Sequence, residues 1–135
     1  RYPGIKSYLT GTVEEARRTG YVETLFGRRR PMADLHSKNR MIAQGAERAA
    51  INMPIQGTAA DLIKKVMLVV EEELAREGLQ ARMLLQVHDE LLFEAPDAEV
   101  EQVSAIARRC MSGVATLKVP LDVEVGVGPN WSDAH

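Results

Sequence analysis

Aromatic residues and cysteine are scarce in this chain of 135 residues. Phe, Tyr and Trp together make up 4% of the sequence, so a core has to be built mainly from Leu, Ile, Val, Ala and Met. The single cysteine, Cys110, has no partner for an internal disulfide, which excludes the disulfide-rich secreted scaffolds. No apolar run reaches the roughly 18 residues of a membrane-spanning helix. We therefore expect a protein of a reducing compartment that makes no membrane contact.

The sequence also lacks an initiator methionine and a secretory leader, and it opens on Arg1-Tyr2-Pro3-Gly4. This start predicts an excised part of a longer protein. With 45% hydrophobic residues, the chain is long enough for one globular unit with a modest core.

Charge is distributed unequally along the chain. Residues 1–65 contain 12 Lys and Arg against 6 Asp and Glu, and residues 66–135 contain 5 against 13, within a net charge of -2. A basic first half favours contact with phosphates, and an acidic second half favours divalent cations. The triplet Arg28-Arg29-Arg30, beside a predicted turn, is the clearest basic candidate. Ordinary solvated surface charge is the alternative for both halves.

Apolar spacing and capping residues predict four helices. Asn52-Met53-Pro54 is expected to separate the second from the third, because proline lacks an N–H and disfavours helix in the residue before it. Asp97 is the expected N-cap of the last helix. The predicted helices cover residues 5–19, 39–51 and 54–77, and a segment that opens at Pro96-Asp97.

Two hairpins and one further strand complete the predicted order. The first hairpin covers residues 21–30 around Phe26-Gly27, and the second covers about residues 81–95. A last strand is expected over residues 121–127, where apolar and acidic residues alternate strictly. This order predicts an α+β fold in which an antiparallel sheet carries helices on one face.

The second hairpin turns at His88-Asp89-Glu90, and this turn is the most informative feature of the sequence. Two carboxylates and an imidazole at the tip of an otherwise buried hairpin need a partner, because buried charge is costly. Side chains alternate along a strand, so one of the two carboxylates is the expected metal ligand. Mg²⁺ suits such a site, since it takes one or two carboxylates together with substrate phosphates. An ordinary acidic surface turn is the alternative interpretation.

Arg48, Asn52 and Gln56 are spaced by four residues and share one face if the helix is continuous. Arg binds phosphates, sugars or base edges, and Asn and Gln reach acceptors that every base pair shows in the minor groove. The row therefore indicates contact with a nucleic-acid duplex that is not sequence-specific. The small residues that follow, Gly57 to Ala60, allow either a close nucleic acid or a tight helix-to-sheet contact.

These segments resemble the carboxy-terminal part of family A DNA polymerases, and the resemblance covers essentially the whole chain. The similar motifs are Gly20–Arg30, Ala46–Asp61, Gln86–Glu90, Val119–Leu121, Val123–Gly126 and Trp131. The resemblance implies an incomplete polymerase palm over residues 39–135. It also implies a fingers-adjacent helix and basic hairpin over residues 1–38. The segment Pro31 to Leu35 departs from the Pro-Asp-Ile-like segment of the family, so the path of this loop is not implied.

Site residues follow from the resemblance. It implies that Asp89 is one of two aspartates that bind the catalytic ions and that Glu90 supports it electrostatically, so both are catalytic candidates. His88 is placed near the primer terminus. The implied DNA-binding residues are Arg48, Asn52, Gln56, His88, Arg28, Arg29 and Arg30.

The implied activity is that of a DNA-directed DNA polymerase in DNA replication and repair. Such an enzyme adds deoxynucleotides to a primer 3'-hydroxyl by nucleotidyl transfer with two Mg²⁺ ions. The implied partners are primer–template DNA, deoxynucleoside triphosphates and the remainder of the polymerase chain, in the bacterial cytoplasm at the nucleoid. The other metal-binding aspartate and the nucleotide-gripping helix of the family lie upstream of these motifs. We therefore expect the chain alone to be inactive.

Three other functions are consistent with parts of the sequence. A noncatalytic duplex-binding module would bind with a steep salt dependence and without Mg²⁺. A single-subunit RNA polymerase shares the palm, but its turn usually reads His-Asp-Ser, so Glu90 favours DNA synthesis. A metal-dependent hydrolase is disfavoured because His36 and His135 stand alone and are expected on the surface.

Overall fold

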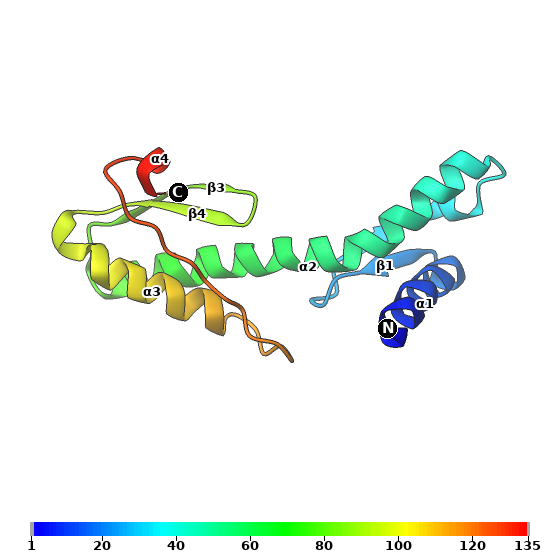
Figure 1. Ribbon diagram of the computed structural model, residues 1–135, viewed down its shortest axis with the longest axis horizontal. Helices are drawn as coiled ribbons and strands as arrows, with labels where there is room; N and C mark the ends of the chain where they lie inside the picture. The colour runs from blue at the N-terminus through cyan, green and yellow to red at the C-terminus, as the bar shows by residue number, and fades with distance from the viewer. Residues whose placement is uncertain (1, 135) are drawn as a thin grey trace. The chain divides into compact units, whose positions relative to one another are not determined.

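The computed structural model describes residues 2–134. They form two compact units, with the boundary between Asp61 and Leu62. Both units contain helices and one small antiparallel sheet of two strands (Figure 1). The α+β class is confirmed, although the strands form two separate sheets instead of one. Among the described helices, none combines the length and the apolar character needed to cross a membrane. The predicted boundary between subdomains at residue 38 stays a prediction.

The first unit opens with a helix and a hairpin, as predicted. The helix ends at Gly20, whose φ of 85° is the left-handed conformation that glycine adopts without strain. In the hairpin, Val22 lies opposite Arg30 in antiparallel register. The elements are α1 (Pro3–Thr19), β1 (Tyr21–Glu23), β2 (Arg29–Pro31), the 3-10 helix η1 (Ala33–His36) and the beginning of α2 (Arg40–Arg76). Their core consists of Ala16, Val22, Met32, Leu35, Ala46, Ala50 and Met53.

Helix α2 corrects the prediction of two helices, because it runs unbroken from Arg40 to Arg76 with Pro54 in its interior. An interior proline costs a helix about 3 kcal/mol, since one backbone hydrogen bond is lost and the ring crowds the preceding turn. Ala50 and Met53, just before Pro54, are buried in the core of the first unit. Burial of apolar residues on the helix thus outweighs the local preference for a break.

The second unit packs a hairpin and a helix against the later turns of α2. Met83, Leu91 and Phe93 of the hairpin contact the core, so helices cover one face of this sheet. Leu79 donates its backbone N–H to the Leu74 carbonyl at 3.1 Å where the chain leaves α2. The elements are β3 (Arg82–Val87), β4 (Glu90–Glu94), the 3-10 helix η2 (Asp97–Glu99), α3 (Val100–Gly113) and α4 (Trp131–Ala134). Their core consists of Val66, Val70, Leu74, Ala81, Val103, Ile106 and Cys110.

The predicted N-cap role of Asp97 is wrong. Asp97 enters the 3-10 turn η2, one turn before α3, and no side-chain capping bond is formed there. Glu99 occupies the N-cap position of α3, but its side chain makes no capping bond. Its carboxylate instead accepts the backbone N–H groups of Gln80 and Ala81, each at about 3.0 Å. Glu99 thereby ties the start of the hairpin to the start of α3.

The predicted last strand over residues 121–127 is also wrong. The segment is neither helix nor strand, although Leu121, Val123 and Val125 are half-buried while Asp122 and Glu124 are exposed. A strand exists through a ladder of hydrogen bonds to a neighbour, and no strand of the described residues pairs with this segment. The alternation thus correctly predicts the sidedness of residues 121–125, but Val127, predicted on the same apolar side, is 60% exposed. Alternation also cannot supply the partner strand.

Candidate functional site

The His-Asp-Glu turn is a tight connection of two residues between β3 and β4, with Val87 opposite Glu90. His88 has a φ of 53°, the only positive φ among the described residues other than glycine. Primed hairpin turns favour a positive φ at their first central residue, and this conformation costs energy for a side chain such as histidine. The Gln86 side chain donates to the His88 carbonyl and holds the turn from within the hairpin.

The turn is exposed, which corrects the expectation of an otherwise buried hairpin. His88, Asp89 and Glu90 are all exposed, and Leu84 and Leu85 are 53% and 40% exposed. The charged side chains at this tip are solvated, so there is no burial cost that a ligand would have to offset. In the part of the chain that the structure describes, no hydrogen bond or ion pair occupies the Asp89 carboxylate. Its oxygens are therefore accessible to a ligand.

Metal-binding potential at the turn is limited to single residues. Within residues 2–134, no group of three or more His, Cys, Asp and Glu side chains lies close enough to hold an ion. Asp89 can supply oxygen donors of the kind that Mg²⁺ prefers. A complete site at Asp89 would need ligands from elsewhere.

The polar row on α2 lies on a continuous helix, which is the condition under which its members share one face. Because the helix is unbroken, Arg48, Asn52 and Gln56 follow one another at four-residue intervals along one face. All three are exposed, while Ala50 and Met53 point into the core. The row is thus open to a ligand that lies along the helix.

The basic hairpin is engaged within the chain at two of its three arginines. Arg28 donates from Nε to Asp61 Oδ1 at 2.7 Å and from Nη2 to the Gly57 carbonyl at 3.1 Å. Arg29 pairs with Glu23 at 3.1 Å and lies 4.4 Å above the centre of the Tyr21 ring. Contact of the three arginines with DNA stays a prediction.

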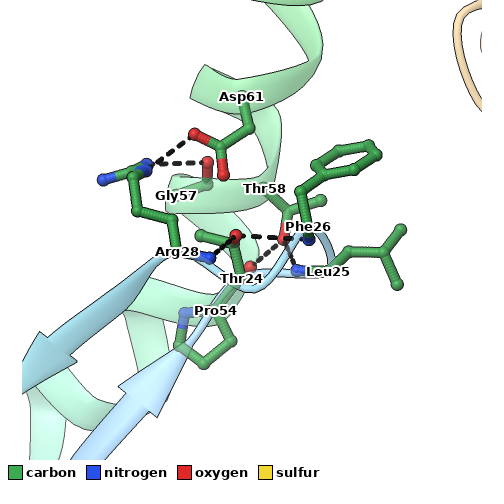
Figure 2. Close-up of polar contacts among 8 residues, drawn as sticks. All are labelled: Thr24, Leu25, Phe26, Arg28, Pro54, Gly57, Thr58 and Asp61. Atoms are coloured by element: carbon green, nitrogen blue, oxygen red, sulfur yellow. Dashed lines mark hydrogen bonds and ion pairs between the residues drawn. The ribbon is translucent and has the colours of Figure 1, made fainter.

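A polar cluster joins the β1–β2 loop to α2, as Figure 2 shows. Gly57 lies so close to the loop that an added Cβ would sit 2.8 Å from Thr24 Cγ2. The tight contact predicted at Gly57 is thus present, but it is made with the loop that follows β1 and not with the sheet itself. Sequence reasoning missed Thr24, Thr58 and Asp61. Their hydrogen-bond partners are as many as 33 residues away in the sequence. Only the run of small residues that starts at Gly57 indicated that another segment comes close to the helix there.

Of the two other histidines, the structure describes only His36, which lies on the surface as expected. His36 is exposed, and its Nε2 lies 3.2 Å from the Arg17 carbonyl. His135 lies outside the described residues.

Comparison with known proteins gives consistent matches. The family model described as DNA polymerase family A matches residues 1–133. DNA polymerase I of Pseudomonas aeruginosa is 53% identical over 135 residues, which is 100% of this chain and 15% of that protein. DNA polymerase I of Deinococcus radiodurans is 54% identical over 132 residues, which is 98% of this chain and 14% of that protein.

Among solved structures, one described as the POL domain of Pol1 from M. smegmatis in complex with DNA primer-template and dNTP is similar throughout. It has a TM-score of 0.96 at 46% identity, covering 99% of this chain and 24% of that one. The chain thus spans only about 15% of the length of the curated relatives that it matches. On the match over residues 1–133 and these identities, the chain belongs to DNA polymerase family A.

Proposed function

We propose that this chain is the carboxy-terminal part of a DNA-directed DNA polymerase. The observation that supports it most is the exposed Asp89 carboxylate, at the tip of a hairpin in a chain that matches the family over residues 1–133. Because the chain spans 15% of its Pseudomonas aeruginosa relative, nucleotidyl transfer belongs to a longer polypeptide, and the chain alone is inactive.

Asp89 binds one of two Mg²⁺ ions in this proposal, and Glu90 beside it adds negative charge near the ions. The fit rests on the donor chemistry, since carboxylate oxygens suit Mg²⁺ and those of Asp89 are accessible. The other protein ligands come from outside the described residues, which hold no cluster of three potential ligands. When bound, two such ions stabilise the attacking and leaving oxygens of an in-line displacement at phosphorus.

Arg48, Asn52 and Gln56 contact the primer–template duplex, and His88 lies at the primer end. Amide and guanidinium donors on an exposed helix face reach minor-groove acceptors that all correct base pairs share. Contacts of this kind test the shape of a base pair and tolerate any correct pair. The similar Pol1 structure is described with DNA primer-template and dNTP, and we extend both partners to this chain.

The basic triplet contacts the duplex backbone. A guanidinium carries five N–H donors, so Arg28 and Arg29 keep donors for phosphate beside their bonds within the chain. Arg30 is exposed and well suited to a phosphate oxygen. In this assignment residues 1–38 adjoin the fingers and residues 39–135 belong to the palm.

Exposed apolar side chains of the second unit suit contact with the remainder of the polymerase. The remainder of a full-length polymerase offers further surface against which such side chains can be buried. A location at the nucleoid of the bacterial cytoplasm is part of the same proposal. The large exposed apolar residues are Leu68, Val69, Leu84, Leu85, Val119, Val127 and Trp131.

Primer extension by the full-length polymerase tests the role of Asp89. Asp89→Asn removes the charged oxygen ligand at constant size, and Asp97→Asn is the matched control, since Asp97 is exposed and forms no capping bond. Losing one ligand of an ion that stabilises charge in the transition state should cost at least ~3 kcal/mol, or about 100-fold in rate. Binding of primer–template should change by less than about twofold.

Near-normal extension by Asp89→Asn would contradict the metal-ligand assignment. Binding of duplex DNA that is indifferent to Mg²⁺, with no extension by the full-length protein, would favour the noncatalytic duplex-binding module instead.

A further inference from the structure

The loop between β1 and β2 is bonded to α2 through Thr58 (Figure 2). The backbone N–H of Leu25 donates to Thr58 Oγ1 at 2.9 Å. The Thr58 hydroxyl donates in turn to the carbonyl of Pro54, one turn earlier in the helix. One hydroxyl thus joins the loop to the helical turn that begins at the proline.

Arg28 fixes the same helical turns at two further points. Its Nη2 donates to the Gly57 carbonyl and its Nε to Asp61 Oδ1. Only 12% of the Asp61 side chain is exposed, against 49% of that of Arg28. A half-exposed ion pair adds little stability, but a planar guanidinium bonded at two points constrains direction.

The loop itself is rigid enough to act as a support. Thr24 is 4% exposed, and its Oγ1 accepts the backbone N–H groups of Phe26 at 3.3 Å and Arg28 at 3.2 Å. Its backbone N–H donates to the Arg28 carbonyl at 2.9 Å, and Gly27 turns the chain with a φ of 81°. Helix α2 therefore contacts a loop that is held in shape by its own hydrogen bonds.

These contacts begin at Pro54, where the hydrogen-bond ladder of α2 lacks one donor. Pro54 has no N–H for the carbonyl of Ala50, and helices bend where such a bond is missing. The interruption lies between Asn52 and Gln56, two members of the exposed polar row. Without a support, the direction of the helix after Pro54 is less well determined than before it.

Gly57 also fixes the rotation of the helix about its axis. With 3.6 residues per turn, neighbouring residues point about 100° apart, so a Gly57 that faces Thr24 turns Gln56 away from the loop. Gln56 is exposed, as this geometry requires. The loop thus determines the direction in which the helix face that carries Gln56 points.

We infer that the loop Thr24–Arg28 positions Gln56 for contact with the primer–template duplex, by holding α2 at Thr58, Gly57 and Asp61 after the interruption at Pro54. Thr58 and Asp61 are positioning residues in this scheme, and they touch no substrate. The role rests on the polymerase function proposed above.

The test compares threonine variants in the full-length polymerase. Thr58→Val removes the hydroxyl at nearly constant shape, and Thr58→Ser keeps it. Thr12→Val is the matched control, because the Thr12 hydroxyl also bonds the carbonyl four residues earlier, at 2.8 Å, on α1. The readout is the ratio of kcat/KM for extending a matched primer end to kcat/KM for extending a mismatched one.

Thr58→Val should change this ratio by about threefold or more, because the Leu25 N–H loses its acceptor and the loop loosens. Thr58→Ser and Thr12→Val should leave the ratio unchanged. In a Gln56→Ala background, Thr58→Val should have no further effect on the ratio, since the two residues act on one contact. Asp61→Asn, which weakens the contact with Arg28, should change the ratio in the same direction and serves if Thr58→Val does not fold.

A ratio for Thr58→Val equal to that for Thr12→Val would overturn the inference, and so would additive effects of Thr58→Val and Gln56→Ala. Loss of extension in Asp89→Asn reports on the polymerase function separately. An active parent enzyme with unchanged ratios therefore refutes the positioning role alone.

Discussion

Two glycines of α2 should respond differently to the same added methyl group. Gly45 and Gly57 both lie inside the helix, so Ala at either position gains the higher helix propensity of alanine. A Cβ built at Gly45 meets nothing within 4 Å. A Cβ built at Gly57 lies 2.8 Å from Thr24 Cγ2 and 3.3 Å from Arg28 Nη2. The pair therefore separates the propensity of the residue from its packing.

The expected difference in stability follows from these contacts. Gly45→Ala should stabilise the first unit by up to ~1 kcal/mol. At Gly57 the same gain is opposed by the clash, and Thr24 cannot yield easily because it is buried and its hydroxyl holds the loop. Overpacking of this kind costs ~1–3 kcal/mol, so Gly57→Ala should range from neutral to ~2 kcal/mol destabilising.

Hydrogen exchange of the full-length polypeptide, read by mass spectrometry, measures the local free energy of opening. Peptides from residues 20–31 should exchange faster in Gly57→Ala than in the parent, because the loop is pushed from the helix. In Gly45→Ala, peptides from α2 should exchange at the parent rate or more slowly. Equal protection by the two alanines would refute the close approach at Gly57.

Two further predictions concern other parts of the chain. Gln56→Ala in the full-length polymerase should slow primer extension or alter the extension of mismatched ends, because an amide donor to the minor groove is lost. A steady-state extension assay with matched and mismatched primer ends checks this. An unchanged rate and error profile would show that Gln56 does not contact the duplex. Burial, and secondarily the charge of Glu73, raises the pKa of the Cys110 thiol, so alkylation near pH 8 should be slow until the protein unfolds. Since the folded state holds this proton more tightly, stability should fall as the pH rises from about 8.5, the ordinary thiol pKa, to the higher pKa of the folded thiol. Rapid labelling of native protein would contradict the burial.

Features with a local cause could be predicted from the sequence. The end of α1 at Gly20, both hairpins and the turn at His88-Asp89 depend on residues within a few positions of one another. Turn residues and alternation determine such features whatever the rest of the chain does. The prediction that the polar row shares one helix face depended on only one condition, an unbroken helix.

Features that depend on distant partners could not be predicted in this way. Pro54 lies within a helix because core residues on that helix are buried, and residues 121–127 form no strand because no described strand pairs with them. The bonds of Thr58 and Asp61 to the β1–β2 loop join residues 33 positions apart, and no periodicity reports such a pairing. The sequence predicts which faces are apolar, and the tertiary structure decides what covers them.

The composition of the His-Asp-Glu turn is not explained by stability. His88 holds a positive φ that glycine would adopt at lower cost. Because the tip is exposed, its imidazole and carboxylates contribute no burial to the hairpin, and polar residues of many kinds would be tolerated there. A sequence chosen for folding alone would relieve the strain at His88. A strained backbone that presents an accessible carboxylate is instead the arrangement expected where a side chain must reach a ligand, which is the role proposed for Asp89.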